Sequence, residues 1–336
     1  MMNKKRTTIA DVARAAEVSI MTVSRAVNDK PGVGPELRQR IMALAEEMGY
    51  RPNHIARGLA TRQTATIGLV VPDIANPFFA QMARGAEDAA FEAGYNLFLI
   101  NTAEDRGREE AALESLLQKE IDGIILCSSR LPGDELQESV SRFPAVVLVN
   151  RDLPAPADNV ALLNVNDELG ARLAVQHMVA SGRQRIAFVA GPATSISGQR
   201  RVDGYRAALK TAGLTFDPEM LEHCAPTTAG GANGAAAILA RRPKVDAILA
   251  FNDLVAFGVI QACEQIGREV PGQLAVIGFD DVPLAEIMRP QLTTLHVNLT
   301  QSGRLAMQTL LGAISGEDSV MPSYQLDPEL MVRESA

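Results

Sequence analysis

Hydrophobic residues follow two different patterns along the chain, and the change falls near residue 64. Beyond it, short apolar runs alternate with longer stretches in which apolar residues recur at helical spacing. The runs predict strands over 66–71, 96–101, 123–127, 145–150, 186–190, 247–251 and 275–279. The longer stretches predict helices that include 78–93, 108–119, 168–180, 199–212, 231–240, 254–266 and 299–311. Strands that are apolar throughout and separated by helices indicate an α/β fold with parallel sheets covered on both faces.

This part of the chain is too long for one such sheet, which favours two lobes of similar build. We expect the chain to cross between the lobes at Pro154-Ala-Pro156 and at Arg289-Pro290. Ligands of open α/β sheets bind outside the carboxyl ends of the strands. The loops that follow the strands are therefore the candidate binding loops.

The first sixty residues instead predict three short helices, over 9–16, 20–28 and 35–48. Thr8 and Ser19 have the side chains that cap helix N-termini, and Gly49 suits the left-handed residue after a helix. Two short helices joined by a three-residue turn and braced by a third form a helix-turn-helix. Its second helix enters the major groove of DNA and reaches base edges with its N-terminal side chains.

The charge distribution supports that interpretation. The 336 residues carry a net charge of −8, but residues 1–62 hold eleven Lys and Arg against six Asp and Glu, which gives +5. The remainder is correspondingly acidic, at −13. A small basic segment on a large acidic body indicates a nucleic-acid-binding head. A disordered basic tail is the alternative, and the regular apolar spacing argues against it.

The sequence lacks the signals that mark several other classes of protein. No apolar run approaches the ~20 residues of a membrane helix, and the basic N-terminus has no apolar stretch behind it as a secretory signal would. Three dispersed cysteines are typical of a reducing cytosol. Phosphate-binding, hydrolase and zinc motifs are absent, and we expect neither a cofactor nor a metal. Asp280-Asp281 is weak support for a metal-dependent transferase.

The helix-turn-helix segment is specific enough to indicate a family. Residues 8–28 read TIADVARAAEVSIMTVSRAVN, and residues 49–53 read GYRPN. Both strongly resemble the headpiece of the lactose-repressor/galactose-repressor (LacI/GalR) family of bacterial transcriptional regulators. The resemblance implies a headpiece over 1–51, a hinge helix and linker over 52–63, and a two-lobed effector-binding and dimerisation domain over 64–334. That last domain resembles the type I periplasmic binding proteins.

The resemblance also implies the residues that contact DNA. In the headpiece they are Thr8, Ser19, Ile20, Met21, Thr22, Ser24, Arg25 and Asn28, and in the hinge Asn53, Ala56, Arg57 and Leu59. Leu59 occupies the position of the family's leucine wedge, which kinks the duplex at a central minor-groove step. An ordinary linker leucine covered by the body is the alternative for Leu59.

Polar residues follow the predicted strands where a small ligand would bind. The loop from Asp73 to Phe79 resembles a sugar-binding loop, and Arg201 falls on the family's effector-binding arginine, with Asp280 a candidate partner. The candidate effector-binding residues are Asp73, Asn76, Phe78, Phe79, Asn150, Arg151, Ser195, Ser197, Arg201, Asn252 and Asp280. Such side chains form paired hydrogen bonds to vicinal hydroxyl groups, which indicates a carbohydrate.

Two positions depart from the family pattern. Pro226 stands where the family often has an aromatic residue, so one wall of the usual ring sandwich is missing. Val297, behind an unusual His296, replaces a common glutamine. Because of these two departures, the sequence does not identify a particular sugar.

The sequence thus predicts a dimeric repressor that binds pseudo-palindromic operator DNA in the cytoplasm, at the nucleoid, under control of a sugar or sugar derivative. Its C-terminus carries no leucine heptads of the kind that form tetramers in some family members. A nucleobase or nucleoside effector is the runner-up. A sugar receptor that does not act on DNA and an α/β enzyme acting on sugars are the alternatives from other classes.

Overall fold

The computed structural model describes residues 7–50, 64–316 and 321–336. Contacts divide the chain into two compact units, Met1–Thr64 and Ala65–Ala336, each with its own core. The candidate hinge residues Asn53, Ala56, Arg57 and Leu59 lie outside the described residues.

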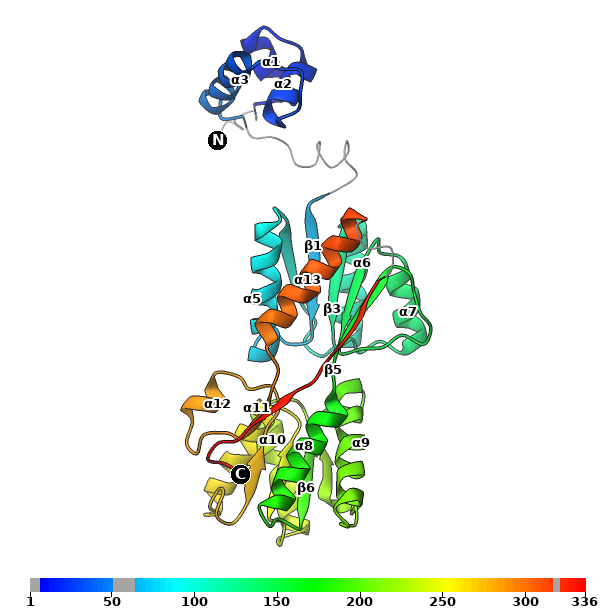
Figure 1. Cartoon of the computed structure of the whole chain (residues 1–336), viewed down its shortest axis with the longest axis vertical. Helices are drawn as coiled ribbons and strands as arrows, with labels where there is room; N and C mark the ends of the chain where they lie inside the picture. Colours follow the sequence, from blue (N-terminus) through cyan, green and yellow to red (C-terminus); the bar gives the residue numbers. More distant parts are fainter. Residues whose placement is uncertain (1–6, 51–63, 317–320) are drawn as a thin grey trace. The chain divides into compact units, whose positions relative to one another are not determined.

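The first unit contains three helices, which confirms the predicted pattern (Figure 1). They are α1 (Ile9–Ala16), α2 (Ile20–Val27) and α3 (Pro35–Glu47). Thr8 caps α1 in a capping box with Asp11, and Ser19 caps α2 by accepting a hydrogen bond from the Thr22 N–H. Val12, Val23 and Ile41 are fully buried at the centre, one from each helix. The helices are therefore held together by the apolar positions that the sequence spacing indicates.

The second unit begins with a lobe built on a six-stranded sheet in the order β11-β5-β4-β3-β1-β2, with all strands parallel. The strands are β1 (Thr66–Val71), β2 (Asn96–Asn101), β3 (Gly123–Cys127), β4 (Val146–Val149), β5 (Val160–Val165) and β11 (Ser323–Leu326). The helices are α5 (Pro77–Glu92), α6 (Arg106–Gln118), α7 (Gly133–Ser141) and α13 (Leu299–Ser315).

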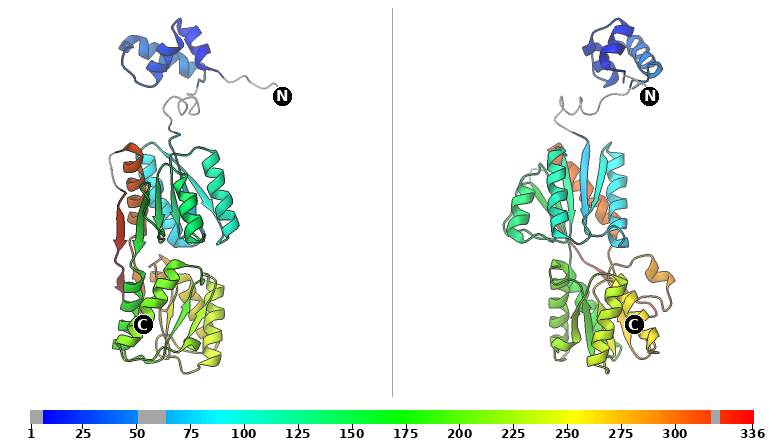
Figure 2. Two further views of the ribbon diagram at one scale, coloured as in Figure 1. Left: turned by 90° about the vertical axis from the view of Figure 1, so that its right-hand side faces the viewer. Right: turned by 180° about the vertical axis from the view of Figure 1, so that it is seen from behind.

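Helices cover both faces of this sheet, as Figures 1 and 2 show. Leu69 of β1 belongs to the apolar cluster formed with α5 and α13, whereas its neighbour Val70 belongs to the cluster formed with α6 and α7. Helices α5 and α13 pack closely because Gly303 has no side chain: a Cβ there would lie 1.9 Å from the Met82 carbonyl oxygen. Burial on both faces explains why the central strands β1, β3 and β4 are almost entirely apolar.

The other lobe carries a four-stranded parallel sheet in the order β7-β6-β8-β9. Its strands are β6 (Ile186–Ala190), β7 (Leu221–His223), β8 (Ala247–Ala250) and β9 (Ala275–Ile277). Its helices are α8 (Asp167–Ala180), α9 (Ile196–Thr211), α10 (Thr228–Arg241), α11 (Asp253–Gln265), the short α12 (Leu284–Ile287) and the 3-10 turn Pro218–Met220.

The chain crosses between the lobes at three points in the described residues, and none is a predicted crossover. They lie between β5 and α8, between β10 (Thr294–His296) and α13, and between β11 and β12 (Glu329–Met331). Pro154-Ala-Pro156 instead joins β4 to β5 within one sheet, and Arg289-Pro290 joins α12 to β10. Both predictions were wrong, because proline fixes φ and removes a donor in any exposed loop and does not mark a lobe boundary.

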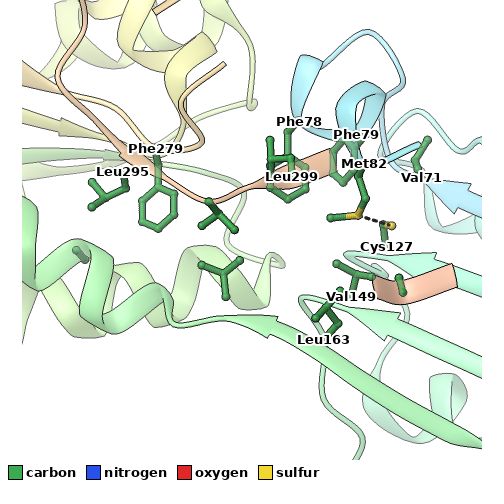
Figure 3. Close-up of a cluster of buried hydrophobic side chains, with 14 of the residues drawn as sticks. Val71, Phe78, Phe79, Met82, Cys127, Val149, Leu163, Phe279, Leu295 and Leu299 are labelled. Carbon is green, nitrogen blue, oxygen red and sulfur yellow. Dashed lines mark hydrogen bonds between the residues drawn. The ribbon is translucent and has the colours of Figure 1, made fainter. Parts of the chain in front are cut away.

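Close to the crossovers, one buried apolar cluster contains side chains from both lobes. Figure 3 shows part of it, with Phe78 and Phe79 beside Met82 and with Phe279 beside Leu295. The carboxyl ends of both sheets are thereby held around a common centre.

Candidate functional site

A cavity lies between the lobes, at the carboxyl ends of strands from both sheets. It is lined by Asn76, Phe78, Phe79, Glu104, Ser128, Arg130, Asn150, Ser195, Ser197, Arg201, Pro226, Phe251, Asn252 and Asp280. All but two of the effector-binding residues predicted from the sequence are in this set. The exceptions are Asp73, which accepts a hydrogen bond from the Ala75 N–H, and Arg151, which donates to the Leu131 carbonyl. Asp73 is held by its own loop and Arg151 by the loop after β3, and neither lines the cavity.

Two aromatic rings come from the start of α5. Asn76 caps this helix by accepting a hydrogen bond from the Phe78 N–H, and Pro77 occupies its first turn. The cap places Phe78 and Phe79 at the cavity, with ring centroids 4.9 Å apart and planes at 80°. Nearly buried rings in this arrangement present a rigid apolar surface.

A third ring comes from Phe251, at the end of β8, which the sequence analysis assigned only to a buried strand. Its ring lies against the backbone of Gly191, where a Cβ would come within 2.7 Å of the ring carbons. Pro226 also lines the cavity, so the family's usual aromatic is absent there. Phe251 nevertheless gives the second lobe an aromatic wall.

Three asparagines provide hydrogen-bond donors. The Oδ1 atoms of Asn76, Asn150 and Asn252 accept hydrogen bonds from backbone N–H groups at 3.0, 3.1 and 2.9 Å. Asn252 uses this bond to cap α11, as Asn76 does for α5. Within the described residues their Nδ2 groups make no hydrogen bond, so the amide donors remain available to a ligand.

Arg201 is held rigidly on α9. Its Nε donates to Asp167 Oδ1 at 2.8 Å, and Nη1 donates to the Phe251 carbonyl. Its Cζ lies 3.5 Å from the centroid of the Phe279 ring and 5.0 Å from that of Phe251. The ion-pair partner is thus Asp167 rather than the predicted Asp280, because α8 places Asp167 beside α9 in the same lobe.

Asp167 is fully buried, and burial raises its pKa even though Arg201 opposes that shift. Ser195 caps α9 by accepting a hydrogen bond from the Gly198 N–H. The guanidinium is therefore fixed by an ion pair, two rings and the geometry of its helix.

Asp280 has a carboxyl group without a partner. The residue is only 5% exposed, and its side chain makes no hydrogen bond with the described residues. Burial raises its pKa well above the usual range, with Arg201 opposing the shift. A buried carboxyl group that faces a cavity without a donor is costly unless a ligand supplies one.

Glu104 and Arg130 form an ion pair in the cavity wall that the sequence analysis missed. Arg130 Nε donates to Glu104 Oε2 at 2.7 Å, and Ser128 stands beside them. Single charged residues in loops carry no spacing signal, so only the three-dimensional structure brings this pair to the site.

Left-handed backbone conformations gather around the cavity. Glu104, Ser128, Asn150 and Asp280 have φ of 60°, 47°, 54° and 116°, values that favour glycine. Each follows a strand of a sheet. Non-glycine residues persist in such conformations where the surrounding structure requires them, and they cluster at functional sites.

The headpiece leaves the predicted base-reading side chains open to solvent. Ile20 and Met21 at the start of α2 are 52% and 63% exposed, and Arg25 one turn later is also exposed. Thr8 and Ser19 are exposed helix caps, and Thr22, Ser24 and Asn28 continue the same helix and its C-terminal cap. Two large apolar side chains exposed at a helix N-terminus are suited to contact with another molecule.

Two findings limit the chemistry of the described chain. No group of three or more His, Cys, Asp and Glu side chains is placed to hold a metal ion within residues 7–50, 64–316 and 321–336. In the same residues, no helix has the length and apolar character needed to cross a membrane.

A helix-turn-helix unit and a two-lobed α/β body with a polar cavity define a DNA-binding regulator that responds to a ligand. Residues 8–53 match the family model "Bacterial regulatory proteins, lacI family", and residues 64–325 match "Periplasmic binding proteins and sugar binding domain of LacI family". The chain therefore belongs to the LacI family of transcriptional regulators and is not an enzyme.

Individual proteins show the same likeness. The ribose operon repressor of Escherichia coli K12 is 38% identical over 98% of this chain and 99% of its own length. The lac repressor dimer bound to operator and the anti-inducer ONPF has a TM-score of 0.88 and 25% identity, with 98% of this chain and 99% of that chain covered. The CelR–cellobiose complex has a TM-score of 0.75 and 31% identity, with 98% and 100% covered.

Proposed function

We propose that this regulator represses transcription from a pseudo-palindromic operator and that a small sugar, bound between the lobes, controls its affinity for DNA. The relatives named for ribose and cellobiose support a sugar as the effector class. We further propose boundaries of 1–51 for the headpiece, 52–63 for the hinge and 64–334 for the effector domain. The site of action is the cytoplasm, on nucleoid DNA.

The unpartnered carboxyl group of Asp280 carries the proposal for a sugar. Two vicinal hydroxyl groups can both donate to one carboxylate, which relieves the cost of its burial. The Nδ2 donors of Asn76, Asn150 and Asn252 then meet hydroxyl oxygens as acceptors. The rings of Phe78 and Phe251 cover the apolar C–H faces of a pyranose or furanose. A polyhydroxylated ring satisfies all three kinds of group together.

Ile20, Met21 and Arg25 are the proposed base-reading residues. Arg25 can donate a bidentate pair of hydrogen bonds to guanine, whereas Ile20 and Met21 offer apolar contact to a thymine methyl group. The remaining proposed DNA contacts are Thr8, Ser19, Thr22, Ser24 and Asn28 in the headpiece and Asn53, Ala56, Arg57 and Leu59 in the hinge.

The active form that we propose is a homodimer, because one headpiece makes few contacts and a two-fold pair matches a palindromic site. The first lobe supports this with large apolar residues in solvent. Phe91 of α5 is 78% exposed, and Phe98 and Leu99 are exposed on β2, the edge strand of the sheet. Apolar residues gathered at a sheet edge are typical of an interface.

The test combines a ligand screen with an operator assay. Melting of the full chain is followed with D-ribose, cellobiose and hypoxanthine, and a ligand at a hundred times its Kd stabilises by about 2.7 kcal/mol. We expect a sugar to raise the Tm and to change operator affinity in fluorescence anisotropy. Asp280→Asn should lose both responses, while Asp203→Asn, an exposed change on α9, should keep them. A response to hypoxanthine alone would replace the sugar with a nucleobase.

A further inference from the structure

We propose that the Glu104–Arg130 ion pair makes the cavity select unphosphorylated sugars over sugar phosphates. The inference rests on the proposed function, because it specifies which form of sugar the same cavity accepts. It concerns a wall of the site that comes from the loops after β2 and β3.

Arg130 is fully engaged by its own lobe. Nε and Nη2 both lie 2.7 Å from Glu104 Oε2, and Nη1 donates to the Ser128 carbonyl at 2.9 Å. Its backbone N–H donates to Glu109 Oε2 at 2.8 Å, and the side chain is only 9% exposed. Each of the three guanidinium nitrogens already has a partner, so a phosphate group at this edge would compete with Glu104 for it.

The other charges around the cavity leave no unpaired cation among the described lining residues. Arg201 is matched by Asp167 at 2.8 Å, and Arg130 is matched by Glu104. Asp280 has no cationic partner within ion-pair distance among the described residues. A phosphate dianion would therefore meet two arginines that carboxylates already neutralise, in surroundings where charge is weakly screened.

Behind this wall, the opposite charges of Glu109 and Arg151 offset each other. Burial raises the pKa of Glu109 and lowers the pKa of Arg151, and each opposes the shift of the other. They add no net cation. The wall thus accepts hydroxyl groups, which both donate and accept hydrogen bonds, and rejects an anion.

Glu104→Gln tests the pair directly, because it removes one negative charge and releases Arg130. Binding of D-ribose, D-ribose 5-phosphate and inorganic phosphate to the full chain is measured by isothermal titration calorimetry. We expect Glu104→Gln to bind D-ribose 5-phosphate at least about tenfold more tightly than the wild type does, since the anion gains a free cation and loses a like charge. D-ribose affinity is measured on the same variant, so that the ratio of the two affinities, rather than either affinity alone, reports the change in selectivity.

Two controls separate the pair from a general effect of charge. Glu104→Asp retains the negative charge and should retain the rejection of phosphate. Glu110→Gln removes a half-exposed carboxylate paired with Arg106 on α6, outside the cavity wall, and should behave as the wild type does. Glu104→Ala, with the same expectation as Glu104→Gln, provides a second neutral variant if one of them folds poorly.

The outcomes distinguish the two proposals. If the wild type binds D-ribose 5-phosphate more tightly than D-ribose, or if neither neutral variant gains phosphate affinity, the assignment to Glu104–Arg130 is overturned. If no sugar changes operator affinity but the neutral variants alone gain binding of inorganic phosphate, the ion-pair assignment stands and the proposed effector class falls.

Discussion

Arg201→Ala should lower the stability of the fold and abolish the response to effector. The contacts of Arg201 suggest variants that measure the two effects separately. Arg201→Ala leaves the carboxylate of Asp167 fully buried without its main partner. Breaking a buried ion pair from one side costs about 3–5 kcal/mol. For a two-lobed body of this size, that lowers the Tm by about 10 °C.

The stability that Arg201→Ala loses should depend on pH, and the direction of this dependence can be predicted. Burial already raises the pKa of Asp167, and loss of Arg201 removes the strongest opposing interaction. In the variant, the folded state therefore holds a proton that the unfolded state releases, over the range between the ordinary pKa of aspartate and the raised one. Stability in that window falls as pH rises, by at most about 1.4 kcal/mol per pH unit. Arg201→Ala should consequently lie closer to the wild type in Tm at pH 5 than at pH 8.

A double variant isolates the sensing role. Arg201→Ala/Asp167→Asn removes the stranded charge, so it should regain much of the lost Tm and show a coupling energy of about 2 kcal/mol or more in a double-mutant cycle. It should still give an operator titration, by fluorescence anisotropy, that no effector changes. The exposed pair Arg206–Asp203 on the same helix, 3.7 Å apart, is the matched control and should show almost no coupling. Equal Tm losses at both pH values, with no recovery in the double variant, would refute the buried-pair reasoning, and a normal effector response would refute the role in sensing.

Three further results are expected. Ile20→Ala/Met21→Ala should change the preferred operator in a binding-site selection while non-specific affinity stays nearly constant, because these side chains contact bases rather than phosphates; an unchanged consensus would count against them. Leu59→Ala should weaken operator binding by about 1–3 kcal/mol and leave binding to random DNA intact, since a wedge acts only at a kinked site; equal losses on both DNAs would contradict this. Phe91→Asp/Phe98→Asp should shift the sedimentation coefficient to that of a monomer, because a charge buried at an interface is costly; a persistent dimer would place the interface elsewhere.

Much of the fold follows from the sequence because its signals are local. The strands β1, β3 and β6 are buried along their whole length, and they begin and end at the predicted residues, as does the exposed edge strand β2. The pattern missed β5 (Val160–Val165), an apolar strand that carries Asn164 and pairs with β4 and β11. It also missed the short β10 and β12, which pair with each other although they lie more than thirty residues apart in the sequence. Elements stabilised by distant partners leave little periodicity to detect.

The residues of the cavity also include some that the sequence could predict and some that it could not. Asn76, Ser195 and Asn252 could be predicted because each combines a strand-end position with a helix-capping side chain. Glu104 and Arg130 could not, since a charged loop residue has no preferred spacing and its partner lies 26 positions away. Phe251 was assigned to the core because an aromatic residue at the end of an apolar run looks the same whether or not a cavity lies beside it.

The capping residues also explain why an effector between the lobes can act as a switch. Asn76 belongs to one lobe and Asn252 to the other, and both occupy rigid helix ends through the same side-chain atom, Oδ1. A ligand that binds their Nδ2 groups together gains both contacts only at one spacing of the lobes. It therefore has a differential affinity for that spacing, which is the thermodynamic requirement for shifting a conformational equilibrium. Arg200 lies next to Arg201 on α9 and bonds to Asp152 of the other lobe, so a movement of α9 toward the effector also moves a contact between the lobes. Because such coupling is reciprocal, operator DNA must change effector affinity by the same factor as the effector changes operator affinity.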